Sequence, residues 1–212
     1  NKIIAENVFS TIAPTYFGKM YESVDSNLQK NESETGVVYA VGSDLSGKNF
    51  DGLNLRNAVF DKANLSNTSF NNADVDGARF VFANLNNSNL FDRIDLSNIN
   101  LAGTNLSNVS LKGKNLSGTI LTGADLSGAN LTGVDLSGKD LTETILTGAN
   151  LSDTNLAGVD LYGKDLTGTI LTGADLSDMD LAGTILAGSD ISDTNLDGVN
   201  LSGVDLSGMD LS

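Results

Sequence analysis

From Leu45 onwards, a large apolar residue recurs at every fifth position, as at Leu121, Leu126, Leu131 and Leu136. Five residues of an α-helix turn through roughly 500°, so these leucines would wander around the helix and form no apolar stripe. In a single flat strand, successive leucines would point to opposite faces, because side chains alternate with a period of two. A chain that bends in the same sense once per five residues can direct every leucine toward a common axis. The period therefore predicts a solenoid.

The other positions of the five-residue unit each have a preferred residue type. The residue two after the centre is Gly in most later units and Asn or Asp in others, such as Asn57 and Asp153. These residues best tolerate a left-handed backbone, so we place the corners there. The residue two before the centre is mostly small and is expected to point inward. Asp or Asn usually precedes the centre and Ser or Thr often follows it, and we interpret both as solvent-facing.

In its clearest copies, such as residues 124–128, the unit reads A-[DN]-L-[ST]-G, and this pattern resembles the pentapeptide-repeat family over about four fifths of the chain. The resemblance implies an all-β solenoid, a right-handed quadrilateral parallel β-helix with four pentapeptides per coil. Four sides have independent support, because Phe50 and Phe70 would then stack on one face and Phe60 and Phe80 on the opposite face. At four units per coil, the repeats predict about 8 coils.

Residues 1–42 differ from the repeats, which we assign to a domain at 43–212. Apolar residues spaced four apart over residues 2–30 match a helical face that Pro14 interrupts. We expect two short helices or one kinked helix, then a polar loop and a strand at 37–41. The expected role of this segment is a short α-helical cap on the first coil, with a partner-binding helix as the alternative.

The five-residue spacing breaks once, between Leu90 and Leu96, where one extra residue and Ile94 and Ile99 predict a bulge or kink. One interpretation is an insertion tolerated at a corner. The other is a raised contact patch, formed by Val81, Phe82, Phe91 and Arg93.

Four lysines occupy the inward position that is otherwise small, where an unpaired ammonium would be costly: Lys48, Lys114, Lys139 and Lys164. We expect them to extend to solvent at corners or to pair with acids such as Asp140 and Asp165. In a similar way, Ile120, Ile145 and Ile170 stand where Asp or Asn normally faces water.

The net charge of −15 lies almost entirely in residues 115–212, which carry fifteen acids against Lys139 and Lys164. Such a surface disfavours nucleic acid and anionic membranes and favours cationic partners or simple solubility. At twenty residues per coil, Asp140, Asp160 and Asp180 would stack. A neighbouring face would alternate Asp and Asn, which relieves charge repulsion. The candidate partner-binding acidic stripes comprise Asp140, Asp160, Asp180, Asp135, Asp175, Asp165 and Asp205.

The residue types present disfavour catalysis and cofactor binding. The chain has neither cysteine nor histidine, which removes disulfides, the usual zinc sites and histidine-dependent nucleophiles. No calcium-binding loop pattern occurs, so we expect no metal and no cofactor. We see no signal peptide or membrane-spanning run and favour a cytoplasmic location, with a secreted effector as the alternative.

The sequence therefore predicts a non-enzymatic β-helix that acts as a rigid protein-interaction or structural module, with an unidentified protein partner. The chain ends in repeats, which predicts association of two copies through the C-terminal coil, a following domain, or an aggregation-prone end. The resemblance also offers an alternative function: family members that confer fluoroquinolone resistance are thought to imitate DNA on gyrase, a type II topoisomerase. The acidic stripes would carry that role.

Overall fold

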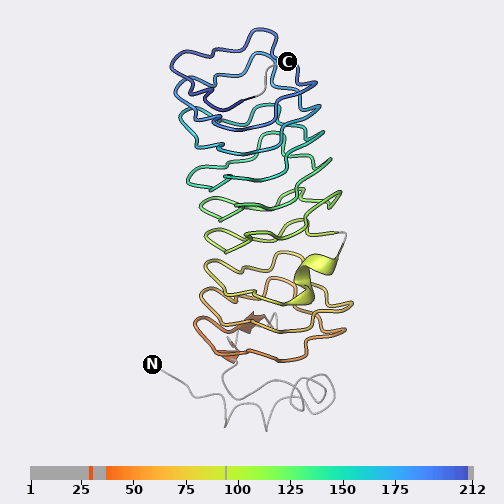
Figure 1. The fold of residues 1–212 in the computed structure, drawn as a ribbon. Helices are drawn as coiled ribbons and strands as arrows, with labels where there is room; N and C mark the ends of the chain where they lie inside the picture. The colour runs from red at the N-terminus through yellow and green to blue at the C-terminus, as the bar shows by residue number, and fades with distance from the viewer. Residues whose placement is uncertain (1–28, 31–36, 94, 210–212) are drawn as a thin grey trace, which may run out of the picture. The chain divides into compact units, whose positions relative to one another are not determined.

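The computed structural model describes residues 29–30, 37–93 and 95–209. Their contacts divide them into two compact units. Unit 1 comprises described residues 29–30, 37–93 and 98–104, and unit 2 comprises 95–97 and 105–209. Figure 1 shows turns of similar outline stacked within each unit.

Unit 1 begins with a short antiparallel hairpin. Strand β1 (Gln29–Lys30) pairs with strand β2 (Val38–Tyr39), with Gln29 opposite Tyr39. Tyr39 also forms a parallel bridge with Val59. The predicted strand at 37–41 is confirmed in part by β2. The predicted helical segment is wrong at its end, because Gln29 and Lys30 pair as a strand, and its remainder lies outside the described residues.

The repeats of unit 1 pair at a constant offset of twenty residues. Parallel bridges join Asp44 to Asn64, and Asn54 to Asp74. Next to the first of these bridges, the Leu45 N–H donates a hydrogen bond to the Asn64 carbonyl at 2.8 Å. Twenty residues are four units of five, so each turn has four sides. Ala40 is buried like a central residue and Gly42 has a corner conformation, so the repeat begins before Leu45.

Two aromatic stacks fill the interior of unit 1, as the sequence predicts. The ring centroids of Phe50 and Phe70 lie 5.0 Å apart with the rings nearly parallel, and those of Phe60 and Phe80 lie 5.4 Å apart. All four side chains are fully buried. The stacks meet edge to face, for example between Phe70 and Phe80. This confirms that the two aromatic columns occupy opposing sides of a four-sided coil.

The extra residue before Leu96 is taken up by a 3-10 helix, η2 (Asn89–Asp92), whose N-terminus is capped by the Ser88 hydroxyl. The pairing offset records the insertion: Val59 pairs with Arg79 twenty residues later, but Arg79 pairs with Asn100, twenty-one residues later. The predicted bulge is therefore confirmed, and it has a helical form. No α-helix occurs in the ranges that the structure describes.

In unit 2, parallel bridges at the same offset join residues such as Asn130 and Asn150. We name its four sides by their central residues. The Leu116 side has Leu96, Leu116, Leu136, Leu156, Leu176 and Leu196; the Leu121 side has Leu121, Leu141, Leu161, Leu181 and Leu201; the Leu126 side has Leu106, Leu126, Leu146, Leu166, Leu186 and Leu206; the Leu131 side has Leu111, Leu131, Leu151, Leu171 and Ile191. Except in the last turns, these side chains are buried.

The corners lie two residues after each centre, as predicted. At these positions φ is positive for glycines such as Gly148, at 68°, and for Asn57, at 57°. A left-handed residue turns the chain sharply from one side to the next, and Gly and Asn adopt this conformation at least cost. Among the described residues, twelve non-glycine residues have a positive φ, and they include Lys62, Phe82 and Glu143 but no β-branched residue.

Inward-facing threonines occupy the small-residue position and cap the corners from inside. Thr144, Thr169 and Thr184 are buried, and the Thr169 hydroxyl donates to the Leu166 carbonyl at 2.8 Å. In the described residues, no buried side-chain nitrogen or oxygen lacks a hydrogen-bond partner. The interior therefore tolerates hydroxyls without the desolvation cost of an unpaired polar group.

Candidate protein-binding surface

The Asp or Asn before each centre bonds to its own backbone. The Asp140 Oδ1 atom accepts the Thr142 N–H at 2.9 Å, and the Asp175 Oδ1 atom accepts the Ser177 N–H at 3.0 Å. Asn155 makes the same bond to the Ala157 N–H. Asp and Asn are short enough to accept a hydrogen bond from the N–H two residues later. These side chains are exposed, yet their orientation is fixed.

Sequence reasoning interpreted this position as a simple solvent choice and missed its structural role. A signal was present, because no unit places glutamate there although glutamate is equally soluble. The longer glutamate side chain does not form the same tight turn. The residue before each centre is therefore selected for the length of its side chain as well as for its polarity.

The structure brings together the residues of the two predicted stripes. Asp140, Asp160 and Asp180 lie on the Leu121 side in successive turns, and all are exposed. On the Leu116 side, Asp135 pairs with Asn155, which pairs with Asp175, and the alternation continues to Asn195. Asp165 and Asp205 lie on the Leu126 side, one on each edge of Ile185. On the alternating side an amide reduces the repulsion between acids, because the Asn115 Nδ2 atom donates to Asp95 at 3.1 Å.

Hydrogen bonds lower the pKa of several of these carboxyl groups. The pKa of Asp140 is lowered mainly by the hydrogen bond from the Thr142 hydroxyl and next by that from the Thr142 N–H. The pKa of Asp135 is lowered mainly by the hydrogen bond from the Ser137 N–H. The pKa values of Asp175, Asp190 and Asp205 are lowered in the same way. The carboxylates are thus held in the charged form.

We expect acid to destabilise the fold through these groups. A carboxyl whose pKa is lower in the folded state stabilises that state above the unfolded pKa, and the contribution is lost as the pH falls through the folded value. The thermal midpoint should hold between pH 7 and 5 and fall below about pH 4. Asp175→Asn, which keeps the acceptor but does not titrate, should flatten the dependence, and Asp175→Glu should lower stability at pH 7. A midpoint that rises on acidification would show that charge repulsion dominates instead.

Two of the inward lysines act on acids, and one of them also bonds to a backbone carbonyl, which the sequence did not predict. The Lys164 Nζ atom donates to the Leu141 carbonyl at 2.8 Å, and its charge contributes to lowering the pKa of Asp140. Lys139 acts on Asp135, and burial lowers the Lys139 pKa. A backbone carbonyl of the preceding turn thus serves as the acceptor for Lys164, an arrangement invisible in the linear sequence.

The four residues of the predicted contact patch are spread over more than one corner of unit 1. Phe82 stands at the corner after Phe80, is 63% exposed, and would meet any side chain added at Gly103. Phe91 belongs to η2, two sides further along the chain. The Arg93 guanidinium donates to the Ala73 carbonyl. Val81 is half-buried beside Phe82. The structure therefore does not bring the four into one patch, and their role in binding stays a prediction.

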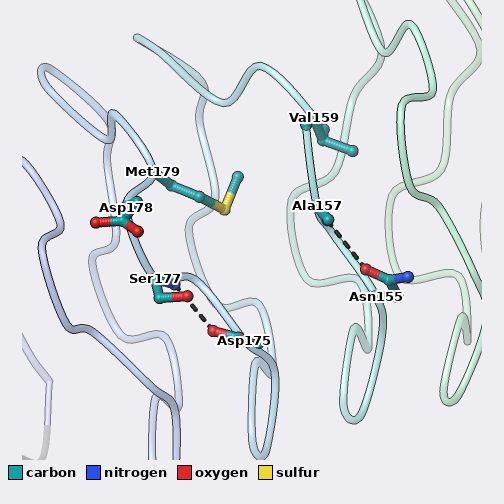
Figure 2. A pocket seen from close by; sticks show the side chains of 8 residues that line it. Asn155, Ala157, Val159, Asp175, Ser177, Asp178 and Met179 are labelled. Atoms are coloured by element: carbon teal, nitrogen blue, oxygen red, sulfur yellow. Dashed lines mark hydrogen bonds between the residues drawn. The ribbon is translucent and has the colours of Figure 1, made fainter.

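One shallow pocket of about 420 Å³ lies between two successive turns of unit 2. Its lining comprises Asn155, Ala157, Gly158 and Val159 from one turn and Asp175, Ser177, Asp178 and Met179 from the next. Figure 2 shows these two stretches side by side, with the Asn155 and Asp175 turn bonds dashed. No group of three or more metal-ligating acids is present in the described part of the chain.

Repeat models of known families decide the classification. The model for pentapeptide repeats matches in eight copies, over residues 41–77, 54–90, 99–138, 140–173 and 174–212. The chain belongs to the pentapeptide-repeat family. Members of this family form right-handed quadrilateral β-helices, in agreement with the four-sided turns of both units. The number of coils and the N-terminal cap remain predictions.

Solved pentapeptide-repeat structures are similar to this chain. HetL, involved in heterocyst differentiation regulation in the cyanobacterium Nostoc, is 29% identical, with 78% of this chain and 84% of HetL covered and a TM-score of 0.35. A protein of the Arabidopsis thaliana thylakoid lumen is 28% identical, covering 57% and 70%, with a TM-score of 0.32. QnrB1, a plasmid-mediated fluoroquinolone resistance protein, is 20% identical, covering 79% and 81%, with a TM-score of 0.37. A search of curated proteins returned no match.

Two other expectations from the sequence concern the last turns of the repeats and a possible membrane span. Leu201 and Leu206 in the last described turn are 40% and 38% exposed, whereas Leu181 is buried. Association of two copies through this turn stays a prediction. In the described ranges, no helix has the length and hydrophobicity that crossing a membrane requires.

Proposed function

We propose that this pentapeptide-repeat chain is a non-enzymatic module that binds another protein through the acidic sides of unit 2. The observation that carries the proposal is the hydrogen bond from each turn's backbone to its Asp or Asn side chain, as at Asp140 and Asp175. A carboxylate that is already oriented loses little conformational entropy on binding, so a surface of such groups is pre-organised for a cationic partner.

The proposal is tested with a photo-crosslinking amino acid placed at one outward position on each side of unit 2: Ser137, Thr142, Thr147 or Ser152. The four variants are incubated with lysate of the source organism, and cross-linked proteins are identified by mass spectrometry. We expect one partner to be captured from one side or two adjacent sides, because a protein covers only part of such a surface. Capture of the same mixture from all four sides, or of nothing, would refute the proposal.

Imitation of DNA on a type II topoisomerase is the second candidate, favoured by the unbroken column of Asp140, Asp160 and Asp180. Gyrase supercoiling with added chain separates the two. Inhibition, or protection from a quinolone, that is lost in an Asp140→Asn, Asp160→Asn and Asp180→Asn triple variant would favour DNA imitation. Unchanged supercoiling at micromolar chain would remove it and leave the first proposal in place.

A further inference from the structure

Two exposed isoleucines share one side of unit 2. Ile145 and Ile185 each precede a centre on the Leu126 side, two turns apart, and are 49% and 38% exposed. The turn between them, which carries Asp165, is paired with both of their turns. The Gly148 N–H donates to the Thr167 carbonyl at 2.8 Å, and Asp165 forms a parallel bridge with Ile185. The two isoleucines therefore stand in one column, about 10 Å apart at twice the ordinary strand spacing.

Acids alternate with the isoleucines along this column. Parallel bridges join Asp125 to Ile145, Asp165 to Ile185, and Ile185 to Asp205. From Asp125 to Asp205, the residue before each centre is therefore an acid, an isoleucine, an acid, an isoleucine and an acid, one per turn. In the described part of unit 2, the Leu121 and Leu131 sides each have a single isoleucine in this position, and the Leu116 side has none. The alternation distinguishes the Leu126 side from the other three.

The isoleucines do not help the turns in which they lie. Each acid of the column accepts the N–H two residues later; the Asp165 Oδ1 atom accepts the Thr167 N–H at 2.9 Å. Isoleucine has no acceptor, and in the described residues the N–H groups of Thr147 and Ala187 donate to no protein group. Each isoleucine therefore gives up a turn bond and exposes apolar surface, neither of which stabilises the isolated chain. Apolar side chains gathered on an exposed surface in this way mark a site of protein interaction.

The spacing of the column matches that of successive turns of an α-helix. Neighbouring turns of the solenoid are about 4.8 Å apart, and the turns of an α-helix are about 5.4 Å apart. A helix that lies along the Leu126 side therefore places its residues i, i+4, i+7, i+11 and i+14 opposite successive members of the column. From the first member to the fifth, the two spacings drift apart by only about 2 Å, which side chains can absorb.

We infer that the Leu126 side, from Asp125 to Asp205, is a docking surface for one α-helix of a partner protein. The helix carries Arg or Lys opposite the three acids and Leu or another large apolar residue opposite Ile145 and Ile185. Charge complementarity selects a basic helix, because residues 115–212 hold fifteen acids and two lysines. A second copy of the chain is a poorer occupant, since a two-fold axis that pairs Ile145 with Ile185 sets Asp165 against its own equivalent. The inference rests on the proposed function and specifies its side and partner chemistry.

The test measures binding of a fluorescent peptide to the full chain by anisotropy at about 0.15 M salt. The peptide, Arg-Ala-Gln-Ala-Leu-Ala-Gln-Arg-Ala-Ala-Gln-Leu-Ala-Gln-Arg, presents its Arg and Leu side chains on one face when helical. The Ile145→Asn, Ile185→Asn double variant should bind at least about 10-fold more weakly, because both apolar contacts are lost. Its thermal midpoint should stay level or rise, because asparagine restores the turn bond. The loss of binding is thereby separated from a loss of folding.

The matched control is the Ile120→Asn, Ile170→Asn double variant. Ile120 precedes a centre on the Leu121 side and Ile170 precedes one on the Leu131 side, and they are 47% and 37% exposed. The control therefore makes the same chemical change twice, on sides that the docked helix does not cover. It should change the affinity for the peptide less than about 2-fold.

A charge variant tests the acidic half of the column. Asp165→Asn keeps the turn bond to the Thr167 N–H and removes the charge that faces the central arginine of the peptide. It should weaken binding about 3-fold at 0.15 M salt, as expected for one exposed ion pair. Asp190→Asn on the Leu131 side is its control, because Asp190 accepts the Ser192 N–H in the same way, at 3.0 Å. The control variant should bind the peptide like the unchanged chain.

Three results with the peptide would overturn the inference. They are equal weakening by the Ile120→Asn, Ile170→Asn control, no saturable binding up to about 1 mM peptide, and equal binding of a peptide whose leucines are each moved two positions, to the opposite face of the helix. Dimers of the free chain that sedimentation detects, and that the Ile145→Asn, Ile185→Asn variant loses, would overturn it in favour of a second copy.

The cross-linking experiment separates this inference from the proposed function. Thr147 lies on the Leu126 side, so the variant with the cross-linker at Thr147 should capture the partner. Capture from Ser137, Thr142 or Ser152 but not from Thr147 would refute the docking surface alone and leave the proposed function intact.

Discussion

Replacing Phe70 by alanine should lower the free energy of unfolding by about 3–5 kcal/mol. The Phe70 side chain is fully buried, and its ring stacks on Phe50 with the centroids 5.0 Å apart. Edge contacts join it to Phe60 and Phe80 at 6.5 and 6.1 Å. The substitution therefore removes a large apolar group and opens a cavity that neighbouring turns, held by backbone ladders, cannot close.

Denaturant unfolding measures this loss, and Phe82 provides a control of the same residue type. Phe82 is mostly exposed and stands at a corner with a φ of 54°, where asparagine is common. Phe82→Asn should change stability by less than about 1 kcal/mol. Because solenoids can unfold in segments, hydrogen exchange at Phe60 and Phe80 should show that the loss is local to unit 1. A cost for Phe70→Ala no greater than that of Phe82→Asn would contradict the stacked core.

Replacing Gly148 by valine should cost about 2–3 kcal/mol, through backbone conformation alone. The φ of Gly148 is 68°, and a β-carbon added there would meet its nearest atom, the Gly128 nitrogen, at 3.8 Å. This is an ordinary contact, so space is not the obstacle. A β-branched residue is strongly disfavoured in the left-handed region, and none of the non-glycine corners in the described residues carries one.

Gly148→Asn is the matched variant, because asparagine occupies six corners of the described residues with φ between 56° and 59°. It should cost about 0.5–1 kcal/mol. Thermal unfolding of both variants gives the comparison. If the valine and asparagine variants lose the same free energy of unfolding, the corner does not select for backbone conformation. The explanation of the glycines two residues after each centre would then be wrong.

The sequence alone predicted the features that depend on a single five-residue unit or on its regular repetition. Leu126 and its equivalents point inward, Gly148 and Asn57 stand at corners, and Phe50 lies over Phe70, because period and backbone preference are local properties. The extra residue before Leu96 was visible for the same reason, although its helical form was not. The turn bonds of Asp140 and Asp175 could have been predicted from the sequence, because glutamate never occurs in the position before a centre.

Only the tertiary structure decided what happens between turns. Which residues of one turn meet those of the next depends on packing at an offset of about twenty residues, and residues twenty apart have no common signal in the sequence. The partners of Lys164 and the separate corners of Phe82 and Phe91 were hidden for the same reason. In a solenoid the short-range pattern determines each turn, whereas packing between turns determines which side chains and carbonyl groups meet.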